Sequence, residues 1–80
     1  GKIMEENISE KNISDRLIAL RAVNKLSLEE VAIKLGVHRE TVRRYENHPK
    51  NMNIDVFIKI LNVYNTNPII FFNEIYGKMS

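Results

Sequence analysis

The stretch that decides the fold is "LSLEEVAIKLGVHRETVRRYEN", residues 26–47. Ser27 can cap the start of a helix, and Glu30 can reach back to it to complete a capping box. Gly36 then stands where a helix commonly ends with one residue in the left-handed conformation, which glycine adopts without strain. These signals predict two short helices, over residues 28–35 and 39–46.

The very short connection between these two helices is typical of a helix-turn-helix. Small Ala32, four residues before Gly36, would let the helices cross closely, and Val37 and Val42 would fill the angle between them. We expect His38 to cap the second helix. Three further apolar residues complete the inward face: Val31, Leu35 and Tyr45.

Helical spacing of apolar residues predicts three more helices around this pair. They cover residues 13–23, residues 54–64 after a cap at Asn53, and residues 68–76. For the last of these, Asn67 is the expected cap, Pro68 suits the first turn, and Gly77 marks the end. The pattern therefore predicts an all-α fold, a compact bundle of five short helices.

The domain organisation follows from this pattern. Residues 1–12 are polar without a clear period, and we interpret them as a flexible N-terminal arm, with an arm that reaches DNA as the alternative. Met4 is a candidate natural start, which would make residues 1–3 an addition. Residues 13–77 form the predicted helix-turn-helix domain, and residues 78–80 form a tail.

Composition restricts the class of protein. The chain has 80 residues, 44% of them hydrophobic and none of them cysteine, which suits one small domain without disulfides or thiolate metal sites. No apolar run is long enough for a membrane span. His38 and His48 lack partners at metal-ligand spacing, and no catalytic set of residues is recognisable. We therefore expect a soluble intracellular protein without metal, cofactor or enzymatic activity.

The net charge of +2 is concentrated in one short region. Residues 38–50 contain four basic and two acidic residues, and the remaining eight basic and eight acidic residues cancel. Such a concentration indicates a local surface for an anion. The outward charged residues of the second motif helix are Arg39, Glu40, Arg43 and Arg44.

The motif resembles the phage repressor and Cro type of helix-turn-helix, also called the Xre type. Residues 26–47 are similar to the family pattern L-S-Q-E-E-L-A-x-K-L-G-V-S-x-x-T-I-x-x-x-E, and "NIDVFIKILNVYNTNP" is similar to the following helices. The resemblance covers residues 13–76. It implies a lambda-repressor-like fold that binds double-stranded DNA with the second motif helix in the major groove.

The resemblance also implies roles for particular residues. The positions that match the base-reading set are Arg39, Glu40, Thr41, Arg43 and Arg44. Those that match phosphate contacts are Ser27, His38, Asn47 and Lys50. Arg21 and Glu46 match a pair that forms a salt bridge behind the recognition helix.

The sequence departs from the family pattern in three ways. Leu28 replaces a glutamine, which removes one expected phosphate contact, and His38 replaces a serine cap, which weakens the start of the second helix. Leu61 and the doublet at residues 71–72 are bulkier than usual. These changes concern affinity and oligomer geometry and leave the predicted fold unaffected.

Simpler interpretations remain open beside these. The three arginines could form a solvated helix face, and Glu40 could pair with Arg44 four residues later instead of contacting a base. The last helix carries large apolar residues that either complete the core or form a dimer surface, the second being our expectation. Those residues are Phe71, Phe72, Ile75 and Tyr76.

The sequence thus predicts a sequence-specific transcriptional regulator, a repressor, that binds DNA as a homodimer. It would act in the cytoplasm of a bacterium or a phage-infected host, on the nucleoid. The alternative is a protein-interaction module with the same fold, such as an antitoxin-like or anti-repressor partner, that binds another protein through its last helix.

Overall fold

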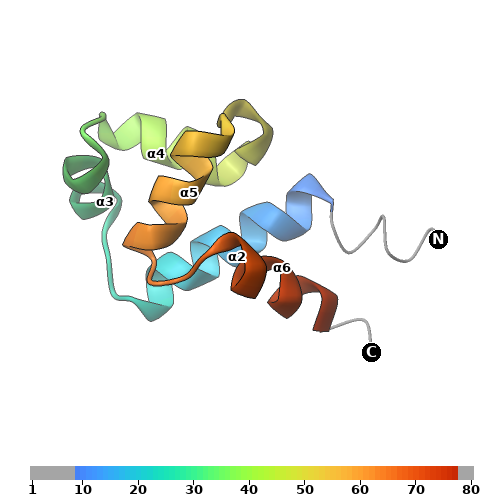
Figure 1. Ribbon diagram of the computed structural model, residues 1–80. Coiled ribbons are helices and arrows are strands. Elements are labelled where there is room, and N and C mark those ends of the chain that lie inside the picture. Colours follow the sequence, from blue (N-terminus) through green and yellow to red (C-terminus); the bar gives the residue numbers. More distant parts are fainter. Residues whose placement is uncertain (1–8, 78–80) are drawn as a thin grey trace.

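A computed structural model describes residues 9–77, and they form five α-helices and one short 3-10 helix without any strand (Figure 1). The elements in chain order are α2 (Glu10–Val23), α3 (Leu28–Leu35), α4 (Arg39–Asn47), η1 (Pro49–Asn51), α5 (Ile54–Val63) and α6 (Pro68–Gly77). The predicted all-α bundle is therefore confirmed. Within the described residues, no helix is long and apolar enough to span a membrane.

The first described helix begins earlier than predicted. Ser9 is the N-cap of α2, and its hydroxyl accepts a hydrogen bond from the backbone N–H of Asn12 at 3.3 Å. Glu10 in the first turn faces the positive end of the helix dipole. Residues 10–12 are thus helical, so the predicted boundary of the arm at residue 12 is wrong, and residues 1–8 and 78–80 lie outside the described residues.

Local signals start the other helices where the sequence predicts. The Asn53 side chain accepts from the backbone N–H of Val56, and the Asn67 side chain accepts from that of Ile70, both at 2.9 Å. Each bond satisfies a donor that the first turn of a helix leaves without a partner. Pro68 occupies the first position of α6, as predicted, and α6 includes Gly77 instead of ending before it.

The core lies where all five α-helices meet. Its members are Leu17, Val31, Ala32, Val42, Ile60, Leu61, Tyr64, Phe71 and Ile75, none more than 5% exposed. Phe57 packs edge-on against Phe71, with ring centroids 5.6 Å apart, and Phe71 packs edge-on against Phe72 at 5.3 Å. Edge-to-face contacts of this kind add to the free energy gained by burial.

This packing corrects the expected dimer surface. Phe71 is fully buried and Ile75 is 5% exposed, so neither side chain is available to a second subunit. Phe72 is half-buried in the ring cluster, and only Tyr76, 37% exposed, reaches the surface. The physical reason is that α6 packs against α2 and α5. These two helices cover the side of α6 that carries Phe71 and Ile75.

The ends of α2 and α5 are tied together by asparagine side chains. The Asn24 amide donates to the backbone oxygens of Leu20 at 2.8 Å and Tyr64 at 2.9 Å, and Asn65 donates to Asn24 at 2.8 Å. Both helices turn through residues with positive φ, 57° at Lys25 and 60° at Asn65. Hydrogen bonds therefore join the turn that follows α2 to the turn that follows α5.

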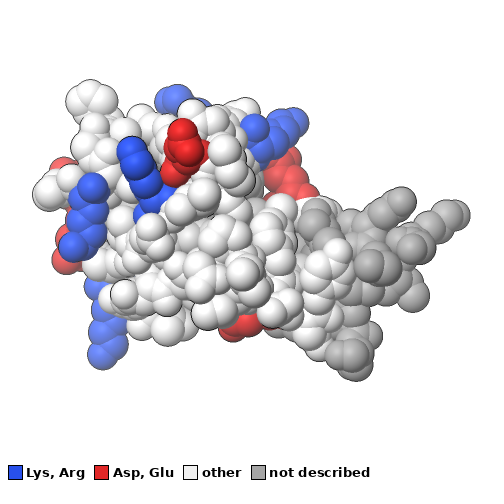
Figure 2. All heavy atoms as spheres, in the orientation of Figure 1, with Lys and Arg blue, Asp and Glu red and all other residues white. Residues whose placement is uncertain are grey.

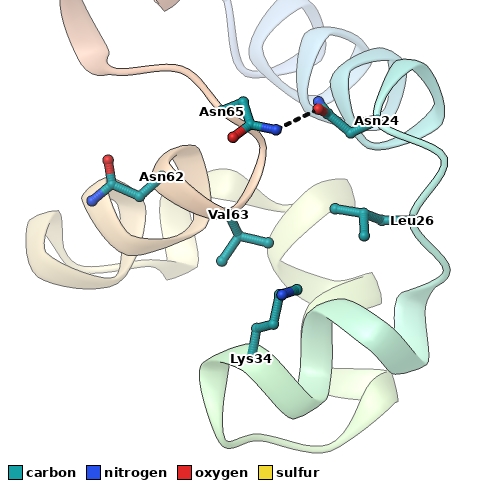
Figure 3. A pocket seen from close by; sticks show the side chains of 6 residues that line it. All are labelled: Asn24, Leu26, Lys34, Asn62, Val63 and Asn65. Carbon is teal, nitrogen blue, oxygen red and sulfur yellow. Dashed lines mark hydrogen bonds between the residues drawn. The ribbon is translucent and has the colours of Figure 1, made fainter.

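A hollow of about 430 Å³ lies beside this link, where the ends of α2 and α5 face α3 (Figure 3). Leu26 and Val63 give it apolar walls, and the Lys34 side chain points into it from α3. The hollow separates the surfaces of α3 and α5 without interrupting the core beneath them, since Val31, Ile60 and Leu61 remain fully buried.

Candidate nucleic-acid interface

The turn between α3 and α4 has the geometry that the sequence predicts. Gly36 adopts φ 72° and ψ 35°, in the left-handed region. Its N–H donates to the oxygen of Ile33 at 3.3 Å, and the N–H of Val37 donates to that of Ala32 at 3.0 Å. This pair of bonds is a Schellman motif, which satisfies the last carbonyls of α3 and turns the chain at once into α4.

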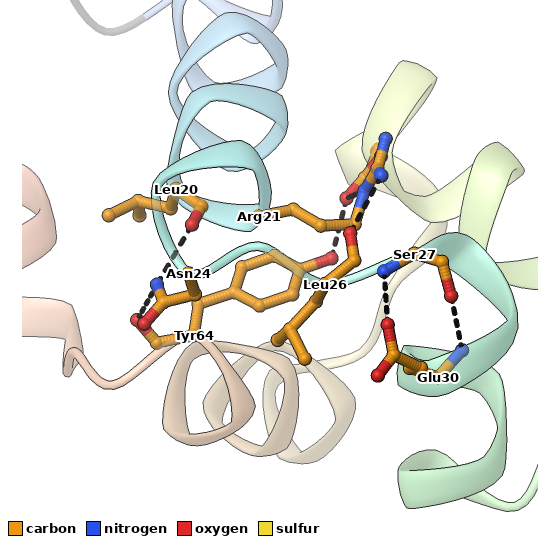
Figure 4. Close-up of polar contacts among 8 residues, drawn as sticks. Leu20, Arg21, Asn24, Leu26, Ser27, Glu30 and Tyr64 are labelled. Carbon is orange, nitrogen blue, oxygen red and sulfur yellow. Dashed lines mark hydrogen bonds and ion pairs between the residues drawn. The ribbon is translucent and has the colours of Figure 1, made fainter.

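The start of α3 is fixed by a complete capping box. The backbone N–H of Glu30 donates to the Ser27 hydroxyl at 3.0 Å, and the Glu30 carboxylate accepts from the Ser27 N–H at 2.9 Å (Figure 4). The Ser27 N–H, then the Ser27 hydroxyl, and the charge of Lys34 hold the pKa of the Glu30 carboxyl below its ordinary value. Leu28 at the first position of α3 is partly buried and packs against the core.

One side of α4 is anchored in the core. Val42 is fully buried and belongs to the same core cluster as Ala32 on α3, and the half-buried Tyr45 packs against this cluster. Since this apolar stripe is narrow, much of the remaining helix surface faces outward, although Glu46 near the end of α4 is also buried. His38 occupies the N-cap position, as expected, but its side chain makes no capping hydrogen bond, so α4 begins without that stabilisation.

The outward face of α4 carries the predicted charged residues. Between 53% and 60% of the side chains of Arg39, Glu40 and Arg43 is exposed, and Arg44 is also exposed, while Thr41 is half-buried. In Figure 2 charged side chains are in view mainly over the left and upper parts of the molecule, with a few at its lower edge. The surface in view over α5 and α6 is mostly uncharged.

Glu40 pairs with different arginines from the one that we considered. Its carboxylate accepts from the Arg43 Nε at 3.1 Å and lies 3.7 Å from the Arg39 Nε. The alternative of a Glu40–Arg44 pair is therefore wrong for this structure, because residues three apart also lie side by side on a helix. Arg44 makes no ion pair with any residue between positions 9 and 77.

The ion pair expected behind α4 is present in the structure. Arg21 on α2 donates through Nε to the Glu46 carboxylate at 2.8 Å and through Nη1 to the backbone oxygen of Leu26 at 3.2 Å (Figure 4). Glu46 is 2% exposed, so donors such as the Arg21 Nε replace the hydrogen bonds to water that its carboxylate loses on burial.

Tyr64 supplies the second of these donors, and sequence reasoning assigned it only to the core. Its hydroxyl donates to the same oxygen of Glu46 at 2.5 Å. Burial raises the pKa of Tyr64 far above its ordinary value, and the Glu46 carboxylate raises it further, so the hydroxyl stays protonated. The sequence did offer a signal for this bond: a tyrosine at the end of an apolar helix face carries a hydroxyl that needs a hydrogen-bond partner when it is buried.

The expected phosphate-binding residues lie at the borders of these helices. His38 stands before α4, Asn47 ends it, and Lys50 follows in η1, all with exposed side chains. The Ser27 N–H is already used in the capping box, and the Lys50 N–H donates to the Glu10 carboxylate at 3.2 Å. For Lys50 the side chain is therefore the group that remains for a phosphate, whereas both the N–H and the hydroxyl of Ser27 take part in the capping box.

Two crossed helices that present a charged face, joined by a left-handed glycine within five α-helices, define the helix-turn-helix class of proteins. A family model described as helix-turn-helix matches residues 17–71. The chain belongs to this family, of the Cro/C1 (Xre-like) type, whose members are DNA-binding regulators and typically not enzymes. Comparison with curated proteins and with solved structures gave no significant match.

Proposed function

We propose that this protein is a sequence-specific transcriptional repressor that places α4 in the major groove of an operator half-site. The observation that carries the proposal is the outward face of α4, with Arg39, Arg43 and Arg44 on a helix held from behind by Glu46. Arginine distinguishes guanine through two hydrogen bonds to O6 and N7 in the major groove. Glu40 and Thr41 complete the proposed base-facing set.

The proposed phosphate contacts surround this face. They come from Ser27, His38, Asn47 and Lys50. A contact of this kind positions the protein on the duplex without selecting a sequence. Binding to the operator would block polymerase access, which places the site of action on the nucleoid, in the cytoplasm.

We further propose that two copies bind one operator as a homodimer. A two-fold dimer would place two copies of α4 about one turn of DNA apart. The apolar side chains of α6 that remain exposed are Ile69 at 74%, Ile70 at 49% and Tyr76 at 37%. These side chains, in place of Phe71, Phe72 and Ile75, are the proposed dimer contacts.

Selection from a random duplex pool tests sequence-specific binding. We expect a near-palindromic motif, whose affinity for the protein falls steeply with salt because bound phosphates release counterions. Arg44→Ala should cost about 1–3 kcal/mol of binding free energy and relax preference at one base pair per half-site. Lys11→Ala, which removes an exposed cation from α2, is the control and should keep the motif.

A protein-interaction module with this fold is the second candidate. An apolar cleft of about 350 Å³ favours it, lined by Ile13, Ile54, Phe57 and Phe72 together with Glu10, Pro49 and Lys50. An antitoxin-like or anti-repressor partner would use such a surface. If the protein selects no duplex and its weak DNA binding is insensitive to salt, this second function replaces the first.

A further inference from the structure

Glu40 holds two arginines of α4 at the same time, one on each side. Its Oε1 accepts from the Nε of Arg43 at 3.1 Å, and its Oε2 lies 3.7 Å from the Nε of Arg39. Arg43 lies three residues after Glu40 and four after Arg39, so it neighbours both on the helix surface, while Arg39 directly precedes Glu40 in the chain. A single carboxylate therefore limits the directions of two guanidinium groups.

Both contacts use the same edge of the guanidinium group. Arginine carries five N–H donors in a rigid plane, one on Nε and four on the terminal nitrogens. Since Nε is the atom that lies nearest to Glu40 in both ion pairs, and no hydrogen bond from a terminal nitrogen of Arg39 or Arg43 to Glu40 is present, these terminal nitrogens remain available as donors. These terminal nitrogens form the fork that guanine O6 and N7 accept bidentately.

The negative charge of Glu40 also weakens non-specific binding to DNA. Three arginines on one helix face would attract any phosphate backbone, regardless of sequence. The carboxylate reduces the net charge of the Arg39–Glu40–Arg43 cluster from +2 to +1, while Arg44 remains without an ion pair to a described residue. Glu40 therefore lowers affinity for all DNA while it fixes the two groups that select a sequence.

We infer that Glu40 is a positioning residue, which aims Arg39 and Arg43 at guanines on neighbouring base pairs and does not itself read a cytosine. The inference rests on the proposed function and narrows the ligand to duplexes whose half-site contains such a pair of guanines. Because all three side chains are more than half exposed, their ion pairs contribute little to folding, and their arrangement matters mainly once DNA is bound.

The test compares the wild-type protein with Glu40→Gln and Asp15→Asn. Glutamine keeps the shape of the side chain but loses the charge that holds both Nε atoms. Asp15→Asn removes an equally exposed carboxylate, which pairs with Lys11 on α2. Each protein selects from the same random duplex pool, and its affinity is then measured for the selected duplex, for duplexes with either guanine changed, and for unselected DNA. Thermal unfolding of each protein serves as the check that all three are folded.

We expect the wild-type motif to contain two guanines on neighbouring base pairs. Glu40→Gln should bind unselected DNA more tightly and lose discrimination at both guanines about fivefold or more, within the range for a bidentate contact. Asp15→Asn should keep the wild-type discrimination. If Glu40 had a purely structural role, Glu40→Gln would change the unfolding temperature without changing the ratio of affinities for the selected duplex and for duplexes with either guanine changed.

Two results would overturn the inference while leaving the proposed function standing. In one, Glu40→Gln keeps full preference for both guanines. In the other, it loses preference for a cytosine alone, which would make Glu40 a direct reader of that base. If the wild-type protein itself selects no sequence, the proposed function fails, and the assignment of Glu40 fails with it.

Discussion

Tyr64 and Glu46 lie 18 residues apart in the sequence and share a hydrogen bond of 2.5 Å inside the protein. The bond ties the end of α4 to α5, and Arg21 ties the same carboxylate to α2. The exposed face of α4 thus depends on a buried contact that three helices share. These bonds hold α4, the proposed recognition helix, in one orientation relative to α2 and α5.

The first prediction concerns the Tyr64 hydroxyl. Tyr64→Phe should lower the free energy of unfolding by about 1.5–3 kcal/mol, because the ring still fills its place while the buried carboxylate loses a donor. Urea unfolding followed by circular dichroism measures the change. Tyr45→Phe is the control, since the Tyr45 ring is half-buried and no hydrogen bond of its hydroxyl to another described residue is present. Equal stability of the two variants would contradict the prediction.

The second prediction compares two arginines with the same exposure. The Arg21 and Arg16 side chains are both 21% exposed, but their partners differ, since Glu46 is 3% and Glu74 is 41% exposed. Arg21→Met should destabilise the protein by about 2–4 kcal/mol, because it leaves a buried carboxylate poorly compensated. Arg16→Met should cost less than about 1 kcal/mol, because Glu74 is hydrated. Chemical denaturation of both variants shows which of them loses more free energy of unfolding.

The third prediction concerns the left-handed turn at Gly36. Nothing lies within 4 Å of the position that a Cβ would take, so only the backbone conformation disfavours a side chain there. Gly36→Ala should destabilise the protein by about 1–2 kcal/mol. Gly77→Ala should not destabilise it, because Gly77 lies outside the left-handed region and alanine favours a helix. A thermal unfolding scan of both variants provides the measurement. An unchanged midpoint for Gly36→Ala would contradict the left-handed conformation of residue 36.

The fourth prediction is a pH dependence from the capping box. The pKa of Glu30 in the folded protein lies below its ordinary value of 4.5, because the Ser27 N–H and then the Ser27 hydroxyl bind the carboxylate. A carboxyl whose pKa is lowered by folding stabilises the protein above its unfolded pKa, and this contribution is lost as the pH falls through the folded pKa.

Glu30→Gln should therefore be less stable than the wild type at neutral pH, and the difference should shrink as the pH falls below 4.5. Denaturant midpoints of both proteins across this range test the prediction. Glu29→Gln removes a neighbouring exposed carboxylate that takes no part in the box and serves as the control. A difference that stayed constant with pH would mean that the charge of Glu30 does not matter.

The sequence by itself determined the five α-helices and most of their ends. Caps at Ser27, Asn53 and Asn67 and the turn at Gly36 were predictable because each depends on residues within four or five positions along the chain. The same locality explains the helix-turn-helix and its outward arginines. The start of α2 was placed too late because its first turn is polar on all sides, although Ser9 carries the local signal of a cap.

Only the tertiary structure decided which side chains remain at the surface and which polar groups meet. Phe71 and Ile75 look alike in sequence to the exposed Ile69 and Ile70, and the crossing of α6 over α2 and α5 buries one pair and leaves the other free. The bond from Tyr64 to Glu46 likewise depends on how α4 and α5 cross. Packing between distant segments sets such contacts, and no local pattern records it.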